Sequence, residues 1–242
     1  MKNQSKWQSS ELATAFLEGV RGAIPAAGLQ LEVMGHVIRS WRAEPQRILD
    51  LGCGDGALGR FLLDRFPTAQ VVFADFSEPM LAAAKKQLAG QPQALVVQAD
   101  FSSAAGLAAV HDHGPFDVVV SGFAIHHQPD QRKKDLYAEI FGLLADGGLF
   151  LNLEHVAPAT PAVESLFDEY FIDHLHRFHQ RQEPGKGREE IALTFYNRPD
   201  KAENILAPVD DQCAWLRRIG FCDVACFFKI FDLALFGGRK AA

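Results

Sequence analysis

ILDLGCGDGALGRFL, residues 48–62, is the segment from which the fold can be inferred. An apolar run at 48–51 leads into a turn with Gly52, Gly54 and Gly56, and apolar residues at helical spacing follow. Glycine permits a tight turn and a close approach to the backbone, and a helix N-terminus presents N–H groups to a ligand. We therefore predict a ligand-binding crevice at the end of a strand.

The alternation of short apolar runs and helical segments continues along the chain. Runs suited to buried strands follow at 70–74, 95–98, 116–120 and 149–153, the last after a turn at 146–148. This alternation is typical of βαβ units and a parallel sheet. A helix at 210–219 closed by Gly220, and strands at 223–230 and 233–236, complete a doubly wound, seven-stranded α/β sheet.

Two segments accompany this core. Apolar positions at helical spacing within 11–41, interrupted at Pro25 and Gly28, predict two helices before the first strand. Between 157 and 208 no strand pattern occurs, and such a length predicts a helical lid inserted after strand five. We expect a single domain over 1–242, with N-terminal helices at 1–45, a binding core at 46–156, the lid at 157–208 and a terminal helix with closing strands at 209–242.

The glycines alone leave two classes of ligand open. Gly54, Gly56 and Gly59 have the spacing of a dinucleotide-binding turn, and Asp75 lies where a nicotinamide enzyme places its ribose-binding acid. Asp50, however, precedes the first glycine, where a carboxylate repels a pyrophosphate but can engage a cationic amino-acid group. The chain also ends in a helix and two strands that a minimal dinucleotide-binding domain does not need.

Five motifs in order resemble those of class I S-adenosylmethionine-dependent methyltransferases, whose sheet is Rossmann-like. They are the segment at 48–62, VVFADFSEPMLAAAK (71–85), VVQADF (96–101), FDVVVSGFAIHH (116–127) and LLADGGLFLNLEH (143–155). The resemblance implies an enzyme that takes a methyl group from S-adenosylmethionine and releases S-adenosylhomocysteine. It places the cofactor in the core predicted at 46–156.

The resemblance also implies which residues bind the cofactor, all of them at the ends of successive strands. They are Asp50, Gly52, Cys53 and Gly54 at the methionine part, Asp75 at the ribose, Phe76 and Met80 beside the adenine, Asp100 and Phe101 at the adenine edge, and Ser121 and Gly122 under the sulfonium. For Cys53, a role as a small packing residue is an equal alternative.

Methyl transfer needs an aligned nucleophile and a group that takes its proton. Candidates for these roles are His126 and His127 after strand four and Glu154 after strand five, with Tyr196 of the lid as a polar anchor. Histidine suits proton transfer near neutral pH, although the same pair of histidines occurs in the family without that role. We expect no metal, because nothing in the sequence directs the lid histidines toward Glu154.

Two alternatives stay open. The helices before the core, the lid and the ending CFFKIFDLALFGGRK (226–240) also resemble carboxy-S-adenosylmethionine synthases, which serve tRNA wobble-uridine modification. In that family a lid arginine holds the extra carboxylate; Arg188 and Arg198 are the lid arginines here, and the first motif, GCGDG, departs from the family's GCSLG-like form. The second alternative is a non-catalytic S-adenosylmethionine-binding module.

Composition limits the partners and the location. The formal net charge is −6, which provides no overall field to attract DNA. No apolar run is long enough to span a bilayer, and residues 1–10 lack the apolar core of a signal peptide, so we expect a cytoplasmic protein that does not bind membranes. The expected partner is a small-molecule acceptor, with tRNA only under the carboxy-cofactor alternative and a homodimer left open.

Overall fold

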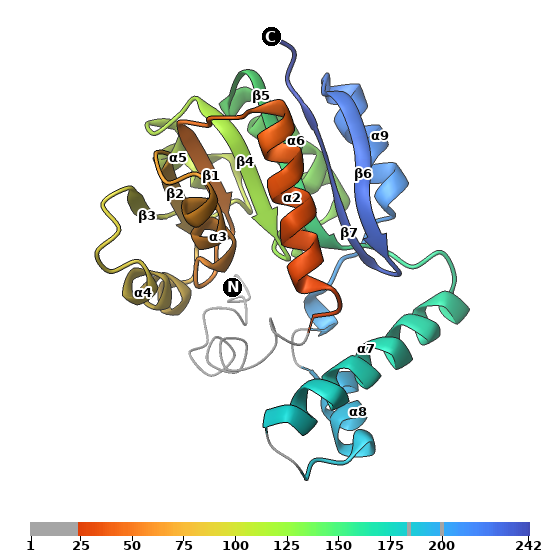
Figure 1. Cartoon of the computed structure of the whole chain (residues 1–242). Helices are drawn as coiled ribbons and strands as arrows, with labels where there is room; N and C mark the ends of the chain where they lie inside the picture. Colours follow the sequence, from red (N-terminus) through yellow and green to blue (C-terminus); the bar gives the residue numbers. More distant parts are fainter. Residues whose placement is uncertain (1–23, 183–184, 199–200) are drawn as a thin grey trace.

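The computed structural model describes residues 24–182, 185–198 and 201–242, which contain one sheet in the order β3-β2-β1-β4-β5-β7-β6 (Figure 1). The first five strands are parallel, β7 is antiparallel to β5, and β6 is antiparallel to β7. The strands are β1 (Arg47–Leu51), β2 (Gln70–Asp75), β3 (Ala94–Gln98), β4 (Phe116–Gly122), β5 (Leu144–His155), β6 (Cys222–Ile230) and β7 (Leu233–Arg239). The predicted seven-stranded α/β sheet is confirmed.

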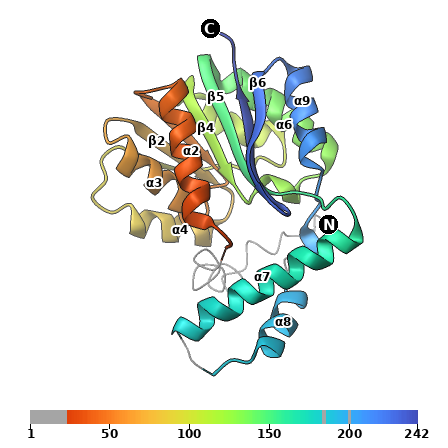
Figure 2. The ribbon, with the colours of Figure 1, turned by 45° about the vertical axis from the view of Figure 1, so that its right-hand side comes forward.

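Helices cover both faces of this sheet (Figures 1 and 2). On one face lie α2 (Ala27–Trp41), α3 (Ala57–Arg65) and α4 (Glu78–Gln87), whose apolar side chains form one core cluster with the sheet. On the other lie α5 (Ala108–His111), α6 (Asp130–Leu143) and α9 (Val209–Ile219), which contribute to a second cluster. Within β1, Ile48 faces the first cluster and Leu49 the second, as strand alternation requires. The doubly wound arrangement is therefore confirmed.

The predicted helix ends agree with the structure where the sequence carries a stop or start signal. Gly220 follows α9 with a φ of 121°, and Pro79 occupies the first turn of α4, where its missing N–H costs nothing. Of the two helices predicted before the core, α2 is present, and the first falls within residues 1–23, outside the described part of the chain.

Two details of the strand prediction are wrong. The third strand, β3, is not buried: it is an edge strand, and Leu95 is 43% exposed. The predicted turn at 146–148 lies inside β5, which already pairs with β4 at Leu144 and bulges before the register resumes at Leu149. Gly147 accommodates this bulge with a φ of 71°.

The segment predicted as a helical lid contains α7 (Pro161–Gln182), α8 (Arg188–Tyr196) and the short 3-10 helix η5 (Lys201–Glu203). Both views place α7 and α8 beyond the edge of the sheet at which β5 ends (Figures 1 and 2). A third apolar cluster, which includes Phe167, Phe171 and Phe195, joins the two helices to Leu233 at the start of β7. These two lid helices are thus packed on one another and on the sheet edge.

Two further 3-10 helices lie in the core, η3 (Ala104–Leu107) and η4 (Ile125–His127), and η4 follows β4 directly. Among the described residues, no helix combines the length and the apolar character that crossing a bilayer requires.

Candidate functional site

The glycine turn lies where the strand order reverses. β1 has β2 on one side and β4 on the other, and the connections from these strands run to opposite faces of the sheet. Ligands of open α/β sheets bind at such a point, outside the carboxyl ends of the strands. The N–H groups of Gly52 and Cys53 both donate to the carbonyl of Ala74, at 2.7 and 3.0 Å, which directs the turn toward the end of β2.

Gly54 borders open space in this crevice. Its φ of +55° favours glycine, and a Cβ added there would have Met80 Sδ, at 4.0 Å, as its nearest neighbour within the described residues. A ligand can therefore lie directly against the backbone between the turn and α4. The neighbouring side chain of Cys53 is 1% exposed and belongs to the core cluster under α3, so its thiol is packed.

Asp75 connects the turn to the start of α4. Its Oδ2 accepts the N–H of Gly54 at 2.9 Å, and its Oδ1 accepts the N–H of Ser77 at 2.8 Å. Burial raises the pKa of this carboxyl, and the hydrogen bonds from Ser77 and Gly54 act in the opposite direction. The carboxyl group that the resemblance assigns to the ribose thus lies at the crevice, next to Gly54.

Asp50 lies beneath the turn and supports α3. Its side chain is 1% exposed, and Oδ2 accepts the N–H of Gly59 at 2.7 Å, in the first turn of the helix. A Cβ at Gly59 would come within 2.2 Å of the ring of Phe73, so glycine is required for this close packing of helix on strand. The predicted contact of Asp50 with an amino-acid group remains a prediction, since its observed partner is the helix N-terminus.

The remaining cofactor candidates divide between the surface and the core. Asp100 is exposed, and its Oδ1 accepts the N–H of Ser102 at 2.9 Å, whereas Phe101 is buried behind Gly52. Ser121 is fully buried, and its hydroxyl donates to the carbonyl of Leu51 at 2.7 Å, so it links β4 to β1. Phe76 and Gly122 are half-buried, and Met80 is buried, with its Sδ 4.0 Å from a Cβ placed at Gly54.

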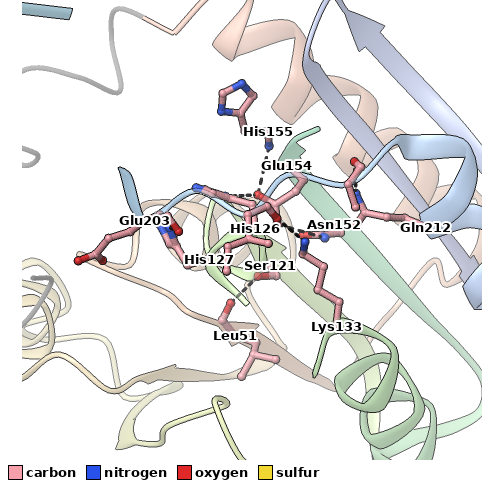
Figure 3. Close-up of polar contacts among 12 residues, drawn as sticks. Leu51, Ser121, His126, His127, Lys133, Asn152, Glu154, His155, Glu203 and Gln212 are labelled. Atoms are coloured by element: carbon pink, nitrogen blue, oxygen red, sulfur yellow. Dashed lines mark hydrogen bonds and ion pairs between the residues drawn. The ribbon is translucent and has the colours of Figure 1, made fainter. Parts of the chain in front are cut away.

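A buried histidine–carboxylate pair lies at the ends of β4 and β5 (Figure 3). Nδ1 of His126 is 2.5 Å from Oε1 of Glu154, and the two residues are 7% and 1% exposed. An ionised carboxylate can only accept hydrogen bonds. In that state Glu154 accepts a hydrogen bond from Nδ1–H of His126, and Nε2 of the ring is left as an acceptor. The ring of His127 lies 3.9 Å from that of His126, so the structure brings together three of the four residues predicted for the reacting end.

A buried polar network fixes Glu154 (Figure 3). Its Oε1 also accepts the N–H of His155 at 3.1 Å, and its Oε2 accepts from the Asn152 amide at 3.4 Å. The same amide donates to the Tyr137 hydroxyl at 3.3 Å, and that hydroxyl donates to Gln212 at 2.6 Å. The sequence prediction missed Asn152, Tyr137 and Gln212; only Asn152, two residues before Glu154 on the same face of the strand, left a signal.

The return segment from the lid is bound to the histidines of η4. Nδ1 of His127 is 3.3 Å from the carbonyl of Glu203, and the N–H of Ile205 donates to the carbonyl of His126 at 2.9 Å. Lys133, 1% exposed on α6, donates to the carbonyl of Ile205 as well as to Asp130. The segment that leads from α8 back to α9 is thereby bound to the backbone of His126.

Two histidines beside His126 are held neutral. Burial lowers the pKa of His127 to about 3, and the neighbouring His126 adds to this effect. Burial lowers the pKa of His155 to about 3 as well, with His126, Arg198 and Lys201 contributing in the same direction. Neither His127 nor His155 therefore carries a charge at neutral pH.

The structure does not place Tyr196 with the other three candidates. Tyr196 is 45% exposed at the end of α8, where its ring lies beside Phe195 and under Nζ of Lys201. Within the described part of the chain no hydrogen bond or ion pair joins it to His126 or Glu154. Among those same residues, no group of three His, Cys, Asp or Glu side chains is arranged to hold a metal ion.

Comparisons with known proteins agree with this geometry. Residues 48–148 match the family model described as a methyltransferase domain. The chain is 36% identical to demethylmenaquinone methyltransferase of Thermus thermophilus, over 52% of this chain and 55% of that protein. It is 23% identical to carboxy-S-adenosyl-L-methionine synthase of Nitratiruptor sp., over 95% of this chain and 91% of that protein.

The fold is also similar to that of a solved structure. Human N-acetylserotonin methyltransferase in complex with SAM aligns with a TM-score of 0.63 and 16% identity, over 98% of this chain and 58% of that one. An identity this low shows a common fold. The chain spans about half the length of the demethylmenaquinone methyltransferases that it matches.

Proposed function

We propose that this chain, which contains a domain of the class I S-adenosylmethionine-dependent methyltransferase family, transfers a methyl group from S-adenosylmethionine to a small-molecule acceptor. The observation that carries the proposal is the contact of Asp75 with the Gly54 N–H, at the point where the strand order reverses. It sets a buried carboxyl beside a glycine whose added Cβ would have Met80 Sδ, at 4.0 Å, as its nearest neighbour within the described residues.

The residues present fit the cofactor. S-adenosylmethionine, when bound, supplies a methyl group on a positively charged sulfur. Asp75 offers oxygens to ribose hydroxyls, the open backbone at Gly54 admits the methionine part, and Met80 provides an apolar wall beside that glycine. The human protein of similar fold is described as a complex with SAM, which supports the same ligand here.

His126 and Glu154 are suited to remove a proton from the acceptor. The Nδ1 contact fixes the ring, and an ionised Glu154 stabilises the imidazolium that forms when Nε2 takes a proton. Burial lowers the pKa of His127 and His155 to about 3, so these two rings bind a proton weakly. We assign His126, the ring in contact with Glu154, as the general base. The network through Asn152 and Tyr137 keeps the pair in place.

A second candidate function is supported by the extent of one comparison. The similarity to the Nitratiruptor carboxy-S-adenosylmethionine synthase covers 95% of this chain and so includes the lid, whereas the family match ends at residue 148. Two lid cations, Arg198 and Lys201, are close enough to lower the pKa of His155. They are the lid cations nearest His155 and are candidates for the additional carboxylate of a modified cofactor, with Lys201 also paired to Asp168 at 3.4 Å; Arg188 pairs with Asp173 and Glu169.

Native mass spectrometry of the purified protein separates these functions. A bound mass equal to S-adenosylmethionine or S-adenosylhomocysteine supports methyl transfer, and a carboxylated analogue supports the second candidate. A bound nicotinamide dinucleotide would contradict both. If the cofactor binds but no acceptor is methylated in a broad screen, a non-catalytic binding module becomes the better description.

A further inference from the structure

Asp232 is a buried carboxylate without a hydrogen-bond partner among the described residues. It lies in the turn between β6 and β7, it is 1% exposed, and neither Oδ1 nor Oδ2 accepts a hydrogen bond there. The backbone carbonyl of Asp232, in contrast, accepts the N–H of Val156 at 2.8 Å. A buried charge with no partner is costly, so its presence calls for an explanation.

The charges around Asp232 do not neutralise it. Asp168 and Glu164 of α7 are near enough to raise its pKa further, in the same direction as burial, and Lys229 is the cation that acts against them. Asp168 already has an ion pair with Lys201 at 3.4 Å. Two carboxylates of α7 and one cation of β6 thus act on the carboxyl group of Asp232.

Aromatic rings surround the same turn. The ring of Phe231, the residue before Asp232, lies 5.4 Å from Tyr170 and 6.2 Å from Phe167. Ring faces carry partial negative charge, and rings next to a carboxylate are a common way to bind an organic cation. Phe231 is 36% exposed and Tyr170 is half-buried, so the rings can be reached from solvent.

This aromatic cluster adjoins the reacting end. The His155 ring lies 5.6 Å from Phe167 and 6.1 Å from His126. A molecule that contacts both Asp232 and His126 would therefore also contact the ring of His155, which lies between His126 and Phe167 of α7.

We propose that the methyl acceptor carries a basic nitrogen, which binds as a cation between the carboxylate of Asp232 and the rings of Phe167, Tyr170 and Phe231. That the bound amine is the methyl acceptor rests on the proposed function, whereas the binding of an organic cation at this place does not. Because Asp232 is 1% exposed, binding requires the side chains that cover its carboxylate to move aside.

Calorimetric titration with three probes tests the site. Benzylamine is cationic, benzyl alcohol is a neutral molecule of similar shape, and benzoate is anionic; each is titrated into the full chain with S-adenosylhomocysteine present. We expect benzylamine to bind about tenfold more tightly than benzyl alcohol, and benzoate to bind more weakly than either. Equal binding of benzylamine and benzyl alcohol, or a preference for benzoate, would overturn the proposal.

Three variants test which side chains cause the preference for benzylamine. Asp232→Asn should abolish the preference for benzylamine, and Tyr170→Leu, which keeps the carboxylate, should reduce it about threefold. Asp146→Asn is the matched control, because it makes the same change on a side chain that is 80% exposed at the start of β5, and it should keep the preference. If the Asp232→Asn variant still prefers benzylamine to benzyl alcohol, the proposal is wrong. Failure of S-adenosylhomocysteine itself to bind would instead count against the proposed function.

Discussion

Nδ1 of His126 and Oε1 of Glu154 lie 2.5 Å apart, with both side chains buried at the ends of adjacent strands. The carboxylate belongs to a chain of buried hydrogen bonds that reaches α6 and α9 through Tyr137 and Gln212. The centroid of the imidazole ring lies 3.9 Å from that of His127. Glu154 is thus fixed by the core, and its contact with Nδ1 fixes the His126 ring in turn.

Glu154→Gln should lower kcat by about 10² to 10³, because the amide cannot stabilise an imidazolium at His126. The affinity for S-adenosylmethionine should not change, since Asp75 and Gly54 lie on other strand ends. Steady-state kinetics with an acceptor found by screening measure the first quantity, and titration measures the second. His36→Asn, on the exposed side of α2, serves as the control and should retain full activity. Wild-type turnover in Glu154→Gln would remove the pair from the mechanism.

Tyr137→Phe should destabilise the fold by about 1 to 3 kcal/mol, because the buried amides of Gln212 and Asn152 each lose a partner. It should also lower kcat, by less than Glu154→Gln does, since Glu154 keeps the N–H of His155. Urea denaturation of the two proteins gives the free-energy difference. An unchanged midpoint would mean that the network contributes nothing to stability.

Acid should destabilise the protein through His127 and His155. Their pKa of about 3 in the folded state lies below the ordinary value of 6.5, so the unfolded chain takes up protons first as the pH falls. The stability contributed by each neutral imidazole is therefore complete above pH 6.5 and is lost between 6.5 and about 3. In His155→Gln, the melting temperature should fall less steeply over this range than in the wild type, and parallel curves would contradict the assignment.

Asp232→Asn should stabilise the ligand-free protein at high pH. Burial raises the pKa of Asp232 from 3.8 to about 6, so stability that is present below 3.8 is lost as the pH rises through 6. The variant avoids this loss and should gain up to about 3 kcal/mol at pH 8, whereas the two proteins should converge below pH 4. Melting curves at several pH values measure the difference. A difference that does not vary with pH would show that folding does not raise the pKa of Asp232.

The sequence predicted the parts of this molecule that short-range patterns encode. The glycine turn after β1, the Pro79 start of α4 and the Gly220 end of α9 each follow from local backbone chemistry. The bulge in β5 was predicted as a turn because Asp146, Gly147 and Gly148 are turn residues, and only the pairing of Leu144 with Phe116 on β4 shows that the strand begins earlier.

The parts that escaped prediction depend on contacts between distant segments. Gln212 approaches Tyr137 from 75 residues away, and Ser121 turns from the crevice because the carbonyl of Leu51 on the adjacent strand accepts its hydroxyl. The contacts of Phe231 likewise depend on how α7 packs against the β6–β7 turn. None of these relationships leaves a periodic or compositional signal in the chain.

The central claim is that the crevice at Gly54 and Asp75 binds S-adenosylmethionine, and calorimetric titration with S-adenosylhomocysteine and NAD tests it most directly. We predict that S-adenosylhomocysteine binds, that NAD does not, and that Asp75→Ala weakens S-adenosylhomocysteine binding by about 1.5 to 3 kcal/mol, the cost of losing hydrogen bonds to a charged group. Binding of NAD without S-adenosylhomocysteine, or unchanged affinity in a folded Asp75→Ala variant, would contradict the claim.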